Sequence, residues 1–354
     1  MNVSKIHSHI SGRNARSFTA DKNDAAYKQL GKFAIGLDGM SFDAAPVSPL
    51  GTASIPTPNQ MLQTWLPGFV AMATAPVKID EILGLTAAGN WADEEVVQKT
   101  LEHVGEAKEY GDNSDTHLAS WNVNYVRRGV VRFEEGFRVG KLEEARSSAI
   151  DINSASEKRA AAVMSLNIQR NKVGFLGYNS TKGTNIYGLL NDPSLPAYES
   201  AAATWAASTA EVIYSQIKTA LSLIRTVSKD LIDPTSHSIT LACATAVVDQ
   251  LNKTNQYGIS VYDLLAKNYP QLRIVSAPQF DAADGGANVA YFIADTVVDG
   301  ASTDGNQAIV QIVPSRYQLL GSEVTAKGYT EAATNATAGV MVKRPYAVQR
   351  LSGI

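Results

Sequence analysis

Two long stretches of this sequence lack the apolar residues that would let them form a core of their own. The first, residues 1–75, is rich in Ser, Ala, Asn, Thr and Pro, and its segment AAPVSPLGTASIPTPNQ shows neither a helical nor a strand period. Proline and small polar residues at this density favour an extended path. We therefore expect an N-terminal arm that lies on something else, docked through the apolar segment MLQTWLPGFVAMATAP at 61–76.

The second stretch, residues 91–125, consists of two polar, charge-dense segments. They are separated by the turn residues Gly111, Asp112, Asn113, Ser114 and Asp115. Turn residues between extended segments predict a long hairpin or excursion. Because it is too polar to bury itself, we expect this hairpin either to be loose or to lie on a neighbouring subunit.

The middle of the chain reads as a strand followed by helices. Alternating residues at 131–135 predict a short strand. From about 142 to 173 the sequence is rich in Ala, Glu, Lys and Arg and predicts a long helix, which the polar residues between 151 and 154 could break in two. A second helix is expected at about 200–230.

Residues 185–198 read NIYGLLNDPSLPAY and combine apolar side chains with strong turn signals. The apolar residues favour burial, whereas Asn-Asp-Pro and the second proline break regular structure and bring the backbone to the surface. A catalytic loop, a ligand lid and a structural anchor beside a long helix all fit this pattern. The candidate residues are Gly188, Leu189, Leu190, Asn191, Asp192 and Pro193.

The last third of the chain changes character. Residues 237–320 alternate between short strands and helices, which predicts a small α/β unit. The chain closes with AGVMVKRPYAVQRLSGI, in which Val340 and Val342 alternate with other residues and Pro345 indicates an edge or an ending strand. Arg344 and Pro345 are candidate structural residues of this segment.

Composition and charge argue against several classes of protein. With 354 residues, 45% of them apolar and 18% charged, the chain is typical of a folded protein with a large core. A net charge of -3 and the lack of a Lys/Arg run argue against nucleic acid as a general ligand. Because no signal-peptide run and no membrane-spanning run are found, we expect synthesis and folding in a cytoplasm, without a membrane anchor.

The residue types that carry chemistry do not form a recognisable pattern. The single cysteine, Cys243, excludes an intrachain disulfide, and its apolar neighbours predict a buried, inert thiol. None of the five histidines has a zinc partner at helical spacing. Nucleophile elbows, Walker-type loops and dinucleotide fingerprints are all missing, so we expect no enzyme activity, no metal and no cofactor.

Three segments carry a resemblance to a known family: FRVGKLEEARSSAID, NKVGFLGY with GTNIYGLLNDP, and VMVKRPYAVQRLSGI. In these segments, and in the order of elements along essentially the whole chain, the sequence resembles the major capsid proteins of tailed bacteriophages with the Hong Kong 97-type fold. The resemblance implies an α+β fold in which the helix at about 142–173 is the spine of a peripheral domain. The GLLNDP loop would then be a structural anchor just past that helix.

The same resemblance implies how the chain is divided into domains. Residues 1–75 would be the N-terminal arm, 76–125 the extended loop region, and 126–236 the first part of the peripheral domain. Residues 237–320 would be the axial α/β domain, and 321–354 would return as the closing strand of the peripheral domain.

The resemblance also implies a function and partners. The chain would be a structural protein that self-assembles into hexamers and pentamers of an icosahedral head around double-stranded DNA, held on the inner face without sequence specificity. A separate scaffolding protein, a portal and, as a further option, decoration proteins would be its partners. The protein would reside in the virion capsid after assembly in the host cytoplasm, without membrane or cofactor.

Charge and side-chain chemistry add two hypotheses about contacts between subunits. Residues 93–112 carry seven acids against two lysines, and opposed charges could fix the register between subunits. The residues in question are Glu94, Glu95, Glu102, Arg127, Arg128 and Arg132. Some members of the family cross-link a lysine to an asparagine; Lys99 or Lys108 and Asn335 could take these parts, although exposed lysines and a loop asparagine are the favoured interpretation.

Two alternatives remain open from the sequence. An encapsulin-like nanocompartment shares the fold, and the cargo of purified shells would distinguish it from a virus head. A soluble α/β enzyme with inserted loops would need a polar pocket within residues 237–320 and would run as a monomer.

Overall fold

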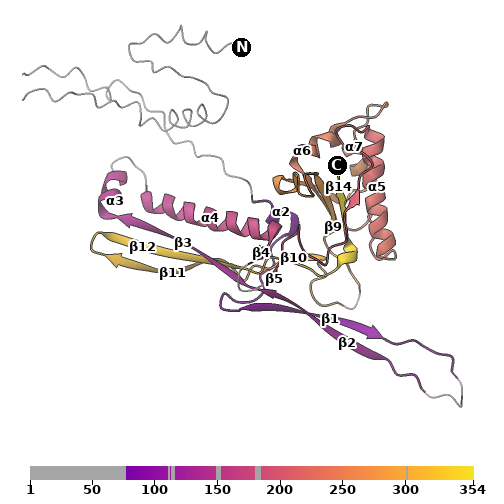
Figure 1. Ribbon diagram of the computed structural model, residues 1–354, viewed down its shortest axis with the longest axis horizontal. Helices are drawn as coiled ribbons and strands as arrows, with labels where there is room; N and C mark the ends of the chain where they lie inside the picture. The colour runs from indigo at the N-terminus through magenta and orange to yellow at the C-terminus, as the bar shows by residue number, and fades with distance from the viewer. Residues whose placement is uncertain (1–76, 111, 113–115, 149–152, 180–184, 300–301) are drawn as a thin grey trace, which may run out of the picture. The chain divides into compact units, whose positions relative to one another are not determined.

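The computed structural model describes residues 77–354, except 111, 113–115, 149–152, 180–184 and 300–301 (Figure 1). The arm expected at 1–75 lies outside the described residues, as does most of the turn expected at 111–115. The described elements belong to one compact unit.

The expected hairpin is confirmed, but it begins and ends four residues later than the sequence indicated. β1 (Glu95–Val104) pairs antiparallel with β2 (Ser120–Gly129) in unbroken register. Pairing therefore continues past Tyr125, where the hairpin was expected to end. Valines on both strands, with Trp121 and Tyr125 on β2, provide the β propensity that the many charged residues concealed.

A three-stranded antiparallel sheet has the order β11–β12–β3. β3 (Val131–Gly140) contains the strand that the alternation at 131–135 predicted. Its partners, β11 (Ser315–Thr325) and β12 (Gly328–Thr337), form a second hairpin that was not predicted. This hairpin was missed because β12 is largely buried although its sequence, GYTEAATNAT, contains three Thr, a Glu and an Asn and no large aliphatic residue.

The long helix expected at 142–173 is two helices, α3 (Lys141–Ser148) and α4 (Ser154–Leu176). The second helix begins at an N-cap, where the Asn153 side chain accepts a hydrogen bond of 3.1 Å from the backbone N–H of Ser156. An N-cap side chain satisfies one of the amides that a helix start leaves unpaired. The break predicted near residues 151–154 is therefore confirmed, and Asn153 is its physical reason.

α4 packs on the three-stranded sheet (Figure 1). Ala162 of α4 lies in a small apolar cluster with Phe137 and Val139 of β3. On β12, the Asn335 side chain donates from Nδ2 to the Leu166 carbonyl of α4 over 3.0 Å. A buried polar side chain is tolerated there because the helix backbone accepts its hydrogen bond.

Before α4 in the chain, the short helix α2 (Ile79–Leu83) docks against it. The Asn171 side chain of α4 accepts two 3.1 Å hydrogen bonds, from the backbone amides of Lys78 and Ile79. Beyond α4, the two-residue strands β4 (Tyr178–Asn179) and β5 (Asn185–Ile186) pair with each other.

A five-stranded mixed sheet has the order β6–β14–β9–β7–β8. Its strands are β6 (Glu199–Ser200), β7 (Ile239–Ala244), β8 (Leu272–Ala277), β9 (Val289–Ala294) and β14 (Val348–Ser352). β7 and β8 are parallel, whereas β9 runs antiparallel to both β7 and β14.

This sheet corrects the expected placement of the closing strand. β14 pairs with β9 and β6, so the end of segment 321–354 belongs to the sheet of the α/β unit and not to the sheet beneath α4. Conversely, β10 (Ile309–Gln311), expected within the α/β unit, pairs with β13 (Val340–Val342) in a separate ladder. Alternation in a sequence predicts a strand, but the partner of that strand depends on contacts far away in the chain.

The helices packed against the five-stranded sheet are α5 (Ala210–Val227), α6 (Thr245–Val248) and α7 (Val261–Asn268). Short 3-10 turns lie at Asp249–Asn252, Pro278–Phe280 and Pro345–Ala347. α5 is shorter than the helix expected at 200–230, since residues 201–209 form turns before it. Among the described residues, no helix is long and apolar enough to cross a membrane.

The main hydrophobic core lies between α5 and the five-stranded sheet. Ile213, Ile217 and Ile224 recur at helical spacing on the buried face of α5. Every residue of β7 and β9 is buried. Cys243 of β7 is fully buried, and burial raises the pKa of its thiol to about 12. The predicted burial of this thiol is confirmed.

Candidate assembly surface

The two sides of the β1–β2 hairpin differ, because one of them carries its largest apolar side chains. Side chains that face each other across an antiparallel pair lie on the same side of the ladder. The register brings Val97, Leu101, Trp121, Val123 and Tyr125 onto one side, among the charged or polar side chains of Glu95, Lys99, His103 and Arg127. The opposite side carries Gln98, Thr100, Glu102, Asn122 and Asn124, together with Val96, Val104, Val126 and Arg128.

The apolar side of the hairpin is exposed. Leu101, Trp121 and Tyr125 expose 57%, 63% and 56% of their surface. Soluble proteins rarely leave several large apolar side chains together in water, and such patches mark interaction surfaces. The hairpin therefore presents a surface that the described part of the chain does not cover.

The acidic residues predicted to contact a neighbour are spread over both sides of this hairpin. The carboxylate of Glu95 lies 3.7 Å from the Arg127 guanidinium across the ladder, and both side chains are more than half exposed. An ion pair this exposed adds little stability. Glu102 is exposed on the other side. Glu94 is also exposed but precedes β1, and its backbone carbonyl accepts from the Val130 amide at 2.8 Å.

Arg128 was expected on a basic surface that meets a neighbour, but its side chain is buried within its own subunit. Its Nη2 lies 2.8 Å from Oδ2 of Asp192, and the two side chains expose 7% and 0% of their surface. The guanidinium also lies over the Tyr187 ring, 4.9 Å from its centroid. Asp192 was expected only as a turn residue of the GLLNDP loop, so its ion pair was missed.

Arg132 is likewise used within the subunit. Its Nε and Nη2 donate to the backbone carbonyls of Trp91 and Asp93 at 2.6 and 2.7 Å. The guanidinium lies 5.4 Å from the centre of the Trp91 ring, a favourable cation–π distance. Of the three predicted arginines, only Arg127 keeps a largely exposed side chain.

The GLLNDP loop closes the end of α4. The amides of Leu189 and Leu190 donate to the carbonyls of Gly174 and Phe175 at 2.8 and 3.0 Å. Leu189 is fully buried, and Leu190 packs against the main core. The expected inward packing of both leucines is confirmed. These bonds satisfy carbonyls that the end of a helix leaves unpaired.

Asn191 completes this closure. Its side-chain oxygen accepts from the Gly188 amide and its Nδ2 donates to the Leu176 carbonyl, both over 2.7 Å. A Cβ on Gly188 would lie 2.4 Å from the Gly177 nitrogen, so only glycine fits there. Pro193 is exposed. The loop is held by specific bonds at both ends, as an anchor requires.

Arg344 fastens a second loop. It donates to both carboxylate oxygens of Asp304 at 2.9 and 3.1 Å, and to the Gln307 carbonyl at 2.8 Å. These hydrogen bonds hold the pKa of Asp304 well below its ordinary value. Arg344 is buried, whereas Pro345 is exposed at the start of a 3-10 turn. Arg344 therefore stabilises the subunit and offers no free charge to a neighbour.

A cross-link through Asn335 does not fit its environment. Asn335 was expected in a loop, but it is fully buried on β12 and bonded to α4. Lys99 and Lys108 are exposed on the hairpin region, as expected. A buried amide cannot reach another subunit's lysine unless α4 separates from the sheet.

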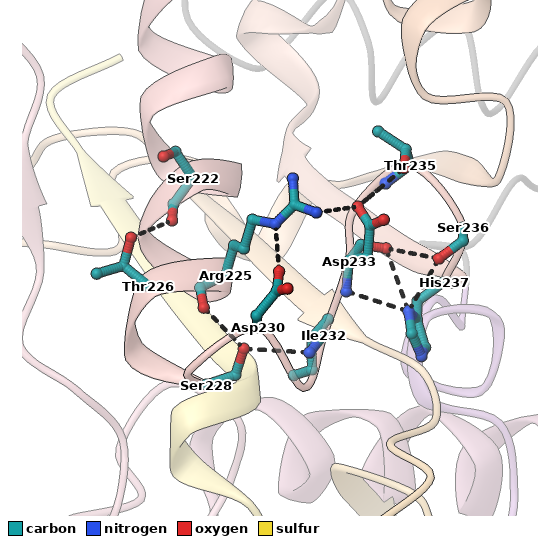
Figure 2. Close-up of polar contacts among 10 residues, drawn as sticks. All are labelled: Ser222, Arg225, Thr226, Ser228, Asp230, Ile232, Asp233, Thr235, Ser236 and His237. Atoms are coloured by element: carbon teal, nitrogen blue, oxygen red, sulfur yellow. Dashed lines mark hydrogen bonds and ion pairs between the residues drawn. The ribbon is translucent and has the colours of Figure 1, made fainter.

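Figure 2 shows a polar cluster where α5 ends. Arg225 donates from Nε to Asp230 at 2.6 Å, and its Nη2 lies 3.3 Å from Asp233. Asp233 in turn donates its backbone N–H to Nδ1 of His237 at 3.1 Å. His237 therefore helps to shape a turn. Among the described residues, no group of three or more His, Cys, Asp and Glu could hold a metal ion.

Three more exposed apolar side chains lie on β11, an edge strand of the three-stranded sheet. Leu319, Leu320 and Val324 expose 50%, 48% and 80% of their surface. The pairing with β12 is irregular near Leu319, and such bulges are a common means of protecting sheet edges. The run YQLLGSEV followed by a glycine turn was the sequence signal that could have revealed this strand.

Comparison with known proteins completes this picture. No curated protein sequence matches the chain. A family model, the Pa193 gp26 major capsid protein, matches residues 48–353.

Solved structures show the same fold at low sequence identity. The chain is similar to the capsid of Myoviridae phage XM1, with a TM-score of 0.69 and 17% identity over 85% of this chain and 100% of that chain. It is also similar to the capsid of a native GTA particle, with a TM-score of 0.56 and 8% identity over 87% and 98% of the two chains. For the capsid of cyanophage P-SCSP1u the TM-score is 0.52, with 12% identity over 87% and 99%.

These likenesses identify the α+β fold as the Hong Kong 97-type capsid fold. The family match spans most of the chain, from the region preceding α2 to the end of β14. The chain therefore belongs to the Pa193 gp26 family of major capsid proteins of tailed bacteriophages, a family of structural shell proteins and not of enzymes.

Proposed function

We propose that this capsid protein assembles into hexamers and pentamers that close an icosahedral head, and that the β1–β2 hairpin covers an adjacent subunit. The exposed apolar face of the hairpin is the observation that carries the proposal. Apolar side chains in water are stabilised when another surface removes them from solvent. In a closed shell every subunit meets identical neighbours, so a second copy can supply that surface.

The edge strand β11 is our candidate for the surface that the hairpin covers. It exposes apolar side chains of its own at Leu319, Leu320 and Val324. Burying apolar side chains of the hairpin against them would contribute about 25 cal/mol for each Å² removed from water. The polar face of the hairpin, which includes Thr100 and Glu102, would then remain in solvent.

The proposal assigns a part of the shell subunit to each region. The β1–β2 hairpin would be the extended loop, and α4 with the three-stranded sheet would be the spine and peripheral domain. The five-stranded sheet with α5 would be the axial domain, joined by β14 from the end of the chain. Residues 1–75, outside the described part of the chain, would be the N-terminal arm.

The proposal extends to partners that would act during head assembly. We propose a separate scaffolding protein, a portal and, in some heads, decoration proteins, with assembly in the host cytoplasm. Packaged double-stranded DNA would contact the inner face without sequence specificity. A net charge of -3 supports weak, unspecific contact, because tight DNA binding depends on many phosphate contacts.

Two substitutions at neighbouring positions of β1 test the role of the apolar face. Leu101→Glu adds a charge to the apolar side, whereas Thr100→Glu adds the same charge to the polar side. We expect Leu101→Glu to abolish shells while Thr100→Glu assembles, as seen by negative-stain electron microscopy and size-exclusion chromatography. Equal assembly of both variants would contradict the proposal.

The contents of purified shells test the proposal that the shell encloses double-stranded DNA. Virus heads made in infected cells should contain double-stranded DNA, measured as nuclease-protected nucleic acid. Shells that contain an enzyme instead of DNA would support an encapsulin-like compartment, which the family match favours less.

A further inference from the structure

The hairpin joins the rest of the subunit through a short, buried junction. β2 ends at Gly129 and β3 begins at Val131, so the backbone passes from hairpin to sheet with only Val130 between them. Val130 is buried in an apolar cluster with Val310 and Met341. Its amide donates to the Glu94 carbonyl, which ties the incoming leg of the hairpin to the outgoing leg.

Arg128 holds the outgoing leg. It lies on β2, two residues before the junction residue Val130, and its ion pair with Asp192 is almost completely buried. Asp192 and Tyr187, which Arg128 also contacts, belong to the segment that closes the end of α4. Separating this pair would leave an uncompensated charge in the interior, which is strongly unfavourable. This contact is therefore a fixed point of the hairpin.

Arg132 holds the incoming leg. It lies on β3, two residues after Val130, and donates to the carbonyls of Trp91 and Asp93 just before β1. Trp91 is itself held to β12, since its indole N–H donates to Oγ1 of Thr334 at 3.4 Å. The acceptors on Trp91 and Asp93 are neutral carbonyls in a largely exposed segment. Water can replace the guanidinium there at a modest cost.

We propose that these two arginines set the angle at which the hairpin leaves the subunit, with Arg128 as a fixed pivot and Arg132 as a releasable clasp. The two contacts attach the two legs of the hairpin to different elements, the end of α4 and the three-stranded sheet. Losing one contact leaves the strand pairing intact but removes one of the two constraints on direction. The expected effect on shell assembly rests on the proposed function, because a misdirected hairpin would not reach a neighbouring copy.

Spin labels can measure this angle in the full-length, unassembled subunit. Thr100→Cys labels the hairpin and Lys327→Cys labels the turn between β11 and β12, both exposed positions. The native Cys243 is buried with a raised thiol pKa, so it stays unlabelled. Double electron–electron resonance then reports the distance distribution between the two labels.

The clasp is tested by Arg132→Gln in this labelled background. We expect a broader and shifted distance distribution than in the parent, with Arg132→Lys between the two because an ammonium can donate to a carbonyl. Arg127→Gln is the matched control: its arginine lies on the same hairpin but is largely exposed, and the distribution should not change. A distribution for Arg132→Gln that coincides with the parent would overturn the role of Arg132.

The pivot is tested by Asp192→Asn, which keeps the shape and removes the charge. We expect a clearly lower melting temperature than for Arg132→Gln, in addition to a broadened distribution. If Asp192→Asn left both the melting temperature and the distribution unchanged, the role of Arg128 as a pivot would be overturned.

Electron microscopy of assembly reactions separates this inference from the proposed function. An Arg132→Gln subunit with a broadened angle that forms few closed shells supports both. A broadened angle with normal shells supports the clasp and contradicts the proposed contact between the hairpin and a neighbouring copy.

Discussion

The five-stranded sheet and the β1–β2 hairpin are both built from strands, but they satisfy their apolar residues in different ways. In the sheet, ITLACA of β7 and VAYFIA of β9 are buried along their whole length by elements of the same chain. In the hairpin, apolar side chains alternate with polar ones, and the largest of them, Leu101, Trp121 and Tyr125, remain exposed. The sheet is therefore stabilised within the subunit, whereas the hairpin needs a second surface.

Folding and assembly should therefore depend on different residues of the same chain. Substitutions in the sheet should lower the free energy of unfolding, and substitutions on the apolar side of the hairpin should act on shell formation. The contacts at the base of the hairpin are those of Arg128 with Asp192 and of Arg132 with Trp91. They hold the hairpin, but we expect them to contribute to the stability of the folded subunit. Four predictions test this division, in order of their effect on the stability of the subunit.

The largest effect is expected for Phe292→Ala on β9. Phe292 is fully buried in the main core, and truncating a buried phenylalanine costs about 3–5 kcal/mol because it leaves a cavity. Urea unfolding of the unassembled subunit measures the loss. A loss below about 1 kcal/mol would mean that the core can collapse around the cavity, and it would weaken the contrast with the hairpin.

Acid should have a smaller effect, through Asp304. The hydrogen bonds from Arg344 lower the pKa of this carboxyl below its ordinary value of 3.8. A carboxyl with a lowered pKa stabilises the folded state at neutral pH, and this stabilisation is lost as the pH falls below the ordinary value towards the lowered one. Thermal unfolding of the parent and of Asp304→Asn should therefore differ at pH 7 and converge in strong acid. A constant difference across this range would contradict the role of the ion pair.

Trp121→Ala on the hairpin should leave the subunit nearly as stable as the parent. Trp121 is 63% exposed, and surface substitutions usually change stability by within about 0.5 kcal/mol. Shell formation should nevertheless fall strongly, because a large aromatic side chain is lost from the apolar face. Urea unfolding and negative-stain microscopy of the same preparation check both halves. Strong destabilisation of the free subunit would show that the hairpin is covered within its own chain.

The smallest effect on stability is expected for the triple substitution of Glu94, Glu95 and Glu102 to Lys. Within the described part of the chain, Glu95 is the only one of the three with an ion pair, and that pair is exposed, so the subunit should remain folded. Shell closure should be impaired if acidic charge fixes the register between subunits. The matched triple substitution to Gln separates loss of charge from its reversal. Normal closure of the Lys variant would end the charge-register hypothesis.

The elements that the sequence predicted are those specified by local patterns. The alternation at 131–135 and the helical composition at 142–173 depend only on neighbouring residues, and both marked real elements. The break before α4 was also local, because Asn153 caps the helix next to it. The inward packing of Leu189 and Leu190 followed from apolar residues set between turn signals.

The hairpin β11–β12 could not be predicted in the same way. Thr334, Asn335 and Thr337 are buried on β12 although polar residues usually indicate an exposed segment. Their burial is possible because Thr334 donates to the Phe133 carbonyl and Asn335 to the Leu166 carbonyl. Both acceptors come from elements far away in the sequence.

The predicted assembly residues fall into two groups, exposed residues and residues buried by contacts with distant parts of the chain. Glu94, Glu102 and Arg127 are exposed as expected, whereas Arg128, Asp192 and Arg344 are buried in ion pairs. A charged residue has the same sequence signal whether water or a carboxylate surrounds it. The local sequence therefore did not indicate which arginine side chain would be exposed.

By itself, the sequence determined a hairpin too polar to form a core of its own, the helical segment with its break near residues 151–154, and the resemblance to a capsid family. Only the tertiary structure decided that β14 joins β9, that β12 lies under α4, and that Arg128 meets Asp192, 64 residues away. Periodicity and capping are set by residues a few positions apart, so a sequence displays them. Strand partners and buried ion pairs depend on which distant surfaces the folded chain brings together, and no local pattern contains that information.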